Sequence, residues 1–589
     1  MHNEKIRKLK GLAIFASDAL SSVAYATEEI LLVLIVVGAS SLTLSIPIAL
    51  AITLLIFLVA ISYRQIIMAY PNGGGSYLVS KENLGTLPSL IAGSSLMIDY
   101  ILTVAVSVAA GVAAITSAIP ILYHHKVALC LLVITLITIT NLRGIRDTAN
   151  VFVMPTYVFI VTIFGLIIYG FYYQMQHPPL PLAPMFNDIA KPLTLFILFK
   201  AFAAGCTALT GIEAISDGVA TFKEPSSRNA SITLIWMAII LGSMFLGITY
   251  LANAFHVVPL HDETVLSQIT RAIFGTSFFY YVVQAATATI LLLAANTAYA
   301  DFPRVASFLA RDSFLPRQLA QVGDRLVFSN GIVILGASSA FLVSFFQGNV
   351  HFLIPLYAVG VFMSFTLSQS GMVKHWFSQR RIFKNWWRLA AINGFGATIC
   401  LVVLIIIASV KFFAGAWLVL LCLPLFVLMF FSIHRHYDAV AVQISVKHFN
   451  PDRPLPPSIT FVLAGNINLP TLRSLHYARA TYGNVTALHV AFSELEAREF
   501  EEQWKDFGMG VPLKVLFSPY RSLFSPVLEY IAEIKDQKDA PLVTVVIPEF
   551  IPAKRWHLFL HNQSAYRLNW ELRKIPGVMV NHYRYRLRV

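Results

Sequence analysis

Long apolar runs fill the first three quarters of this chain and limit its fold more than any other feature. An α-helix needs about 20 mostly apolar residues to cross a bilayer. The sequence is 57% hydrophobic and 12% charged, against roughly 25% charged residues in soluble domains. It therefore predicts an all-α membrane domain, residues 1–433, of about 12 transmembrane helices. The predicted spans are 11–38, 44–66, 88–118, 126–142, 150–173, 191–217, 229–254, 277–301, 330–347, 351–373, 389–411 and 415–433.

The positive charge predicts how these spans are oriented. The net charge is +13, and the loops on the side of the N-terminus hold nineteen Lys and Arg against four in the opposite loops. Such an excess marks cytoplasmic loops. We expect a multi-pass protein in the lipid bilayer of a cell membrane, with both termini cytoplasmic and no nucleic acid polymer as partner. The basic start lacks a small-residue cleavage site, so the first span is expected to stay as an anchor.

The first span is interrupted by polar residues in its middle. Residues 14–32 contain Asp18, Tyr25 and the neighbouring acids Glu28 and Glu29. A charge at the centre of a bilayer costs at least about 2.5–3.5 kcal/mol and survives where it faces a cavity or a partner. A second interrupted segment follows at 201–218. Two broken helices in matching positions of two halves are typical of the central site of a transporter.

The residues in the first interruption favour a cation as cargo. The carboxylate of Asp18, the phenol of Tyr25, hydroxyls and freed backbone carbonyls would form an all-oxygen ligand set, which suits a hard cation. Carriers of amino acids offer helix N-termini to a substrate carboxylate, and Asp18 would repel one. The alternative for Asp18 is a salt bridge or a helix cap.

The third span carries a polar stripe. Asp99, Thr103 and Ser107 are spaced four residues apart, which places them on one face of a helix. The hydroxyls could instead bond to carbonyls of their own helix. That alternative leaves Asp99 unexplained, because an acid so deep in an apolar span is costly.

The second interruption supplies further candidates. Thr210 belongs to it, and Glu213 is either an acid that gains and loses a proton during transport or a buried neutral acid bonded to the broken backbone. Tyr357 in the tenth predicted span either reaches the cavity or packs at an interface. Buried free thiols are expected for the four cysteines, which fall within predicted spans.

The composition changes near residue 434. A charged linker containing prolines covers 434–458, and residues 459–589 alternate apolar strands with helices of 10–15 residues. This alternation predicts a cytoplasmic α/β domain with a parallel sheet. Farther back, the basic amphipathic stretch 302–320 is expected to lie along the membrane surface.

Several motifs resemble the amino acid–polyamine–organocation superfamily. They are YPNGGGSYLVSKENLG (70–85), GCTALTGIEAIS (205–216) and LARDSFLP (309–316), and SDALSSVAY (17–25) is similar to the GDIGTSPLY motif of the KUP potassium-uptake family. The resemblance implies a LeuT-like inverted repeat of five plus five helices with helices 1 and 6 broken, two further spans, and a homodimer that imports potassium with protons.

The resemblance also implies roles for individual residues. Glu213 would be the proton-coupling acid, and Asp18 and Asp99 would supply the charge that holds the metal ion, potassium. The full set expected around potassium is Asp18, Tyr25, Asp99, Thr103, Ser107, Thr210 and Tyr357.

The C-terminal domain resembles the universal-stress-protein fold, but no phosphate loop of that fold is found in it. Regulation by cyclic di-AMP is implied, with Arg521, Lys554, Arg555 and His561 as candidate contacts, each of which is otherwise an ordinary surface or dimer residue.

A secondary active potassium importer, working by K⁺/H⁺ symport and alternating access, is therefore the prediction. No enzyme activity is expected, since the acids lie in membrane spans without a paired nucleophile and base. No cofactor is expected either. The alternative is a proton-coupled amino acid or polyamine transporter of the same superfamily, because Asp18 would accept the ammonium of a polyamine.

Overall fold

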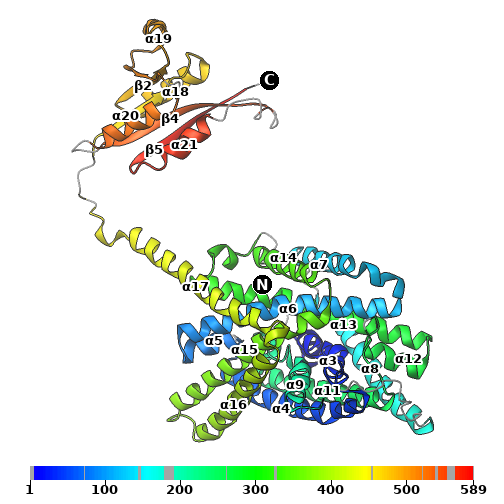
Figure 1. Ribbon diagram of the computed structural model, residues 1–589. Helices are drawn as coiled ribbons and strands as arrows, with labels where there is room; N and C mark the ends of the chain where they lie inside the picture. Colours follow the sequence, from blue (N-terminus) through cyan, green and yellow to red (C-terminus); the bar gives the residue numbers. More distant parts are fainter. Residues whose placement is uncertain are drawn as a thin grey trace. The chain divides into compact units, whose positions relative to one another are not determined.

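The computed structural model divides into two compact units, residues 1–444 and 445–589 (Figure 1). It describes residues 5–71, 73, 75–143, 148–177, 192–260, 262–323, 328–450, 452, 456–519, 522–536, 541–553, 557 and 564–587. Each unit has its own apolar core.

The first unit is helical throughout. Its first half contains α1 (Lys8–Phe15), α2 (Ser17–Ser21), α3 (Val23–Leu34), α4 (Ser45–Ala69), α5 (Gly75–Asn83), α6 (Thr86–Ala118), α7 (Lys126–Leu142) and α8 (Thr148–Gln176). Its second half contains α9 (Leu195–Gly205), α10 (Ala214–Asp217), α11 (Ser226–Ala254), α12 (Val265–Phe274), α13 (Phe278–Arg311), α14 (Ser329–Phe345), α15 (Val350–Ser378), α16 (Trp386–Val410) and α17 (Ala416–Gln443).

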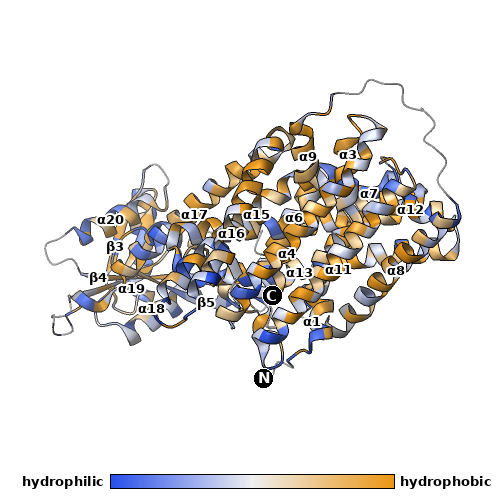
Figure 2. Ribbon diagram, turned by 90° about the horizontal axis from the view of Figure 1, so that it is seen from below, coloured by the Kyte–Doolittle hydropathy of each residue, from blue (hydrophilic) through white to orange (hydrophobic). Residues whose placement is uncertain are grey.

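Ten helices in the described part of the chain are long and apolar enough to cross a membrane. Figure 2 shows the apolar residues that cover helices such as α4, α6 and α11. The remaining two predicted spans are the interrupted segment at 11–38, which forms the short helices α1 to α3, and Ser329–Phe345, which has 17 residues. The number twelve therefore stays a prediction.

Two boundaries differ from those expected from the sequence. The stretch 302–320 is not a separate helix, because α13 continues through its first half to Arg311, with Pro303 inside the helix and Phe302 buried. Its apolar residues pack in the core, and its place along the membrane surface stays a prediction. Helix α17 runs ten residues beyond position 433, since the prolines of the expected linker begin only at residue 451.

The second unit is a five-stranded parallel sheet with helices on both faces. Its strands are β1 (Ser458–Leu463), β2 (Val485–Ala491), β3 (Leu513–Phe517), β4 (Leu542–Ile551) and β5 (Val578–Arg586). They lie in the order β3-β2-β1-β4-β5, and every pair is parallel. The helices are α18 (Leu469–Thr481), α19 (Glu494–Phe507), α20 (Ser525–Lys535) and α21 (Ser564–Leu572). Separate apolar clusters cover the two faces, as the predicted α/β alternation requires.

Candidate functional site

The first interruption is a pair of short breaks rather than a long unwound stretch. Ala16 separates α1 from α2, and Ser22 separates α2 from α3. The Ser21 hydroxyl donates to the carbonyl oxygen of Asp18 at 2.7 Å, and the Ser22 hydroxyl donates to that of Ala19 at 2.6 Å. These hydroxyls satisfy the local backbone, which leaves the side chains of Asp18 and Tyr25 to face the interior.

The second interruption lies directly against the first. Helix α9 ends at Gly205, a 3₁₀ turn covers Cys206–Leu209, and the chain resumes a helix at Ala214. Between them Gly211 has a φ of +76°, and a Cβ atom there would lie 2.7 Å from both the Ala19 nitrogen and Asp18 Oδ2. A glycine is needed here for its backbone conformation and for this close approach.

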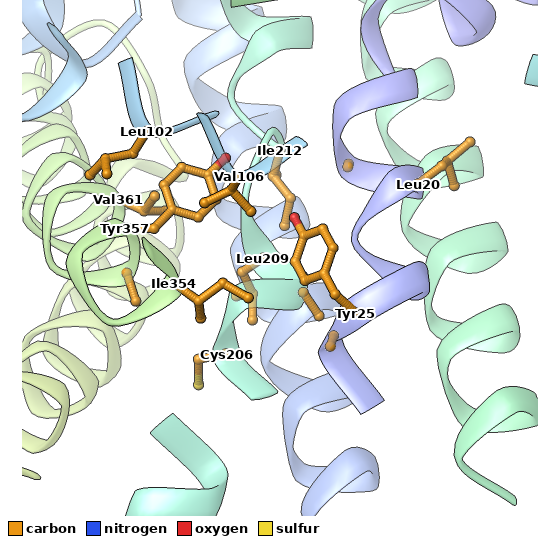
Figure 3. Packing of buried hydrophobic residues seen from close by; sticks show 14 of the residues in the cluster. Leu20, Tyr25, Leu102, Val106, Cys206, Leu209, Ile212, Ile354, Tyr357 and Val361 are labelled. Carbon is orange, nitrogen blue, oxygen red and sulfur yellow. The ribbon is translucent and has the colours of Figure 1, made fainter. Parts of the chain in front are cut away.

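The residues predicted to surround potassium are all buried, each with 7% or less of its surface exposed. Thr103 on α6 and Tyr357 on α15 form a hydrogen bond of 2.7 Å between their hydroxyls. Tyr357 and Tyr25 point their hydroxyls toward the same space beside Val106 and Ile212 (Figure 3). The polar stripe on α6 thus faces the tyrosine of α15, and the alternative in which Thr103 only bonds to its own helix is wrong.

Three buried oxygen atoms in this cluster have no hydrogen-bond partner within the described residues. They are Asp18 Oδ1, Asp99 Oδ1 and the Tyr25 hydroxyl. The charges of Asp18 and Asp99 act on each other and on both tyrosines, so the four side chains form one electrostatic group. Buried oxygens of this kind require a compensating ligand, and their chemistry fits a cation that takes oxygen ligands.

Ser107 and Thr210 complete the predicted set with less direct roles. Ser107 is buried on α6, one turn beyond Thr103. The Thr210 hydroxyl donates to the Thr207 carbonyl oxygen at 2.9 Å, and it also acts on the neighbouring Tyr25 phenol. Its hydroxyl oxygen keeps a lone pair to offer.

Glu213 sits apart from that cluster in a cage of hydroxyl groups. Its Oε2 atom accepts hydrogen bonds from Ser364 on α15 at 3.0 Å, Tyr63 on α4 at 3.1 Å and Ser76 on α5 at 3.2 Å. Its Oε1 atom is buried without a partner in the described residues. The sequence did not single out these three hydroxyl residues, although Ser76 lies within the motif at 70–85.

Two further acids make contacts inside the first unit, Asp301 buried and Asp217 half-buried. Asp217 accepts a hydrogen bond from the Tyr100 hydroxyl at 3.2 Å, and Asp301 pairs with Arg304 at 3.5 Å. Asp301 also acts electrostatically on Asp18.

A cavity of about 90 Å³ lies beside Tyr25, which is one of its lining residues. Glu28 and His351 are among its lining residues. His351 Nδ1 lies 2.6 Å from Glu29 Oε1, and His351 Nε2 lies 3.7 Å from Glu28 Oε1. The acids of α3 are thus held by α15 at the mouth of the cavity.

The four residues suggested as nucleotide contacts, Arg521, Lys554, Arg555 and His561, lie outside the described residues. Their suggested role stays a prediction.

Comparisons with known proteins cover the whole chain. Residues 10–436 match the amino acid permease family, and residues 457–585 match the C-terminal domain of the potassium transporter KimA. The chain is 45% identical to "Potassium transporter KimA" of Bacillus subtilis (strain 168) over 590 aligned positions, which cover 99% of this chain and 96% of that protein.

Proposed function

This chain belongs to the amino acid permease family and within it to the KimA potassium transporters, and from that premise we propose that it imports potassium together with protons by alternating access. Its relative is a transporter and not an enzyme, as the sequence led us to expect.

The group of unpartnered oxygens carries this proposal. Asp18 and Asp99 supply negative charge, while Tyr25 and the bonded pair Thr103–Tyr357 supply neutral oxygens. A large monovalent cation that has lost its water needs several oxygen ligands in place of its hydration shell. Ser107, one turn beyond Thr103 on α6, and Thr210, which acts on the Tyr25 phenol, would complete the shell.

Amino acid cargo is disfavoured by the same geometry. The close approach at Gly211 places Asp18 Oδ2 against the second interruption, where a substrate carboxylate would meet helix ends in an amino acid carrier. A polyamine would need a long site with polar partners along its whole length. The apolar side chains of Leu209, Ile212 and Ile354 lie beside the hydroxyls of Tyr25 and Tyr357 (Figure 3), which disfavours such a cargo.

Glu213 is the proposed proton carrier, because it is the buried acid of the second interruption and has no positive partner among the described residues. We also propose, on the resemblance, the five-plus-five repeat, the homodimer, the cytoplasmic termini, the universal-stress-protein-like second unit and its regulation by cyclic di-AMP. The all-parallel order β3-β2-β1-β4-β5 supports the expected fold of that unit.

The test is rubidium or potassium uptake in cells that lack other potassium importers. Asp18→Asn and Asp99→Asn should each lower uptake about tenfold or more, because a contact with a charged group contributes about 1.5–3 kcal/mol. Asp506→Asn, an exposed acid of the second unit, is the matched control and should leave uptake unchanged. Wild-type uptake at background, or full uptake by the double variant, would contradict potassium as cargo; inhibition by excess spermidine would favour the polyamine alternative.

A further inference from the structure

The hydroxyl cage of Glu213 joins four separate parts of the first unit at one atom. Tyr63 comes from α4, Ser76 from the start of α5, and Ser364 from α15, and all three converge on Oε2 while Oε1 has no partner in the described residues. The side chains of all four residues are fully buried or nearly so. Burying this many polar groups costs free energy unless each of them forms its hydrogen bonds.

The hydroxyl groups around Glu213 have fewer protons to donate than they have contacts at hydrogen-bond distance. Each hydroxyl has one proton to donate, so Tyr63, Ser76 and Ser364 can donate three hydrogen bonds in total. Yet Ser364 and Ser76 also lie 2.7 Å apart, and Tyr63 lies 3.3 Å from Ser76. Tyr63 also lies 3.2 Å from the Ser368 hydroxyl, where either group can donate. The protons of Tyr63, Ser76 and Ser364 must therefore serve the five contacts among these three hydroxyls and Oε2. When all three donate to Oε2, the contacts between the hydroxyls hold no proton.

The charge on Glu213 decides between these arrangements. An ionised carboxylate attracts all three donors, because hydrogen bonds to a charged acceptor are the stronger ones. Once Glu213 is protonated, that attraction weakens, and Ser364 can turn its proton toward Ser76. The contact between Ser76 and Ser364 joins α5 to α15, which pack closely where Gly371 approaches Val79.

The groups facing Glu213 are otherwise acids or phenols. They are Asp217 beyond the second interruption, Asp99 and Tyr100 on α6, Asp301 on α13 and Tyr63 on α4. No Lys or Arg among the described residues pairs with Glu213, so the three hydroxyls are its stabilising partners.

We propose that Tyr63, Ser76 and Ser364 are positioning residues for the proton. They hold Oε2 by hydrogen bonds and leave Oε1 as the atom that accepts the proton. When Glu213 is protonated, Ser364 donates to Ser76 instead, which changes the hydrogen bonding between α5 and α15. This inference rests on the proposed role of Glu213 in proton coupling. In the step itself a proton leaves the oxygen of a hydronium ion, which becomes water, and bonds to Oε1. The only other change is the exchange of hydrogen bonds in the cage.

The test is the pH profile of potassium uptake and potassium-driven proton entry by the full-length protein in proteoliposomes. Ser364→Ala and Ser76→Ala each remove a donor to the ionised carboxylate, so the midpoint of each profile should move to higher pH by about one unit. Ser364→Cys nearly keeps the volume with a weaker donor and should shift the profile in the same direction, which covers a failure of the alanine variant to fold. Ser94→Ala should match the wild type, because this buried serine donates to the Leu90 carbonyl oxygen and has no other hydrogen bond within the described residues.

The two proposals fail in different ways. Proton entry unchanged in Glu213→Gln would overturn the role of Glu213 itself, and this inference with it. If Glu213→Gln abolishes proton entry while the variants at positions 364 and 76 keep the wild-type profile, the cage is structural and this inference alone is overturned.

Discussion

The imidazole of His489, in β2 of the second unit, is held in surroundings that disfavour its charge. It is 2% exposed, its ring stacks on Phe500 at 3.6 Å between centroids, and its Nδ1 lies 2.7 Å from the Ala464 carbonyl oxygen. Burial lowers the pKa of His489 below its usual value, against the opposing effects of that carbonyl and of Glu496. The folded domain therefore keeps this side chain neutral where an unfolded chain would protonate it.

We expect the second unit to lose stability as the pH falls below about 6.5, the usual pKa of histidine. There the unfolded chain binds a proton that the folded domain resists, so the free energy of unfolding decreases by at most about 1.4 kcal/mol per pH unit. Hydrogen exchange of the 485–491 peptide in the full-length protein, at pH 7.5 and 5.5, measures this. His489→Phe keeps the stacking on Phe500 and should flatten the pH dependence; an equal dependence in both proteins would contradict the prediction.

Among the site residues, those that share one sequence segment with other polar site residues could be predicted. Those that a separate helix contributes through packing could not. The spacing of Asp99 and Thr103 on one helical face, and the acid in each interruption, are visible in a single segment. Tyr63 and Ser364 lie in apolar spans with other hydroxyl residues beside them. A serine there usually bonds to its own helix, and a lone tyrosine is commonly a packing residue. Their convergence on Glu213 depends on how α4 and α15 pack, which the sequence does not state.

At the scale of helices, the approach of the two interruptions at Gly211 is the tightest constraint on the site. Its φ of +76° suits glycine, and its neighbours are the Ala19 nitrogen and Asp18 Oδ2 at 2.7 Å from a Cβ position. Any side chain there must move the backbone of α2 or the carboxylate that is proposed to hold potassium.

We expect Gly211→Ala to lower potassium uptake about tenfold or more, mainly through a higher KM, because the strain of about 1–2 kcal/mol at a positive φ is joined by displacement of Asp18. Gly275→Ala is the matched control: Gly275 has a φ of +62° and nothing within 4 Å of a Cβ position. It carries the same kind of backbone strain without the contact, so uptake per folded molecule should stay within about twofold of the wild type. Equal losses in the two variants would show that strain alone, and not the contact with Asp18, matters.

The architecture of the whole molecule was predictable where it follows from local pattern. The apolar spans, the α/β alternation and the parallel pairing all came from periodicity, and the structure confirms mostly helical packing followed by a small sheet domain. The pairing of β1 with β4 joins segments about 80 residues apart, and no local signal specifies it. Helix α12 was missed because its ten residues are too short to read as a span.

The orientation of the first unit in the membrane is the last prediction, and two exposed loop positions can test it. Phe413, between α16 and α17, is 96% exposed, and Ile382, between α15 and α16, is 75% exposed. The excess of Lys and Arg around Ile382 predicts that this loop is cytoplasmic and that the loop of Phe413 is outside. Of the native cysteines, Cys130, Cys206 and Cys400 are buried and Cys422 is half-buried, so the wild-type protein should react little. In intact cells a membrane-impermeant maleimide should label Phe413→Cys and spare Ile382→Cys, which should react once the cells are permeabilised. The reverse labelling pattern would indicate that the termini lie outside the cell and would contradict the proposed direction of potassium transport.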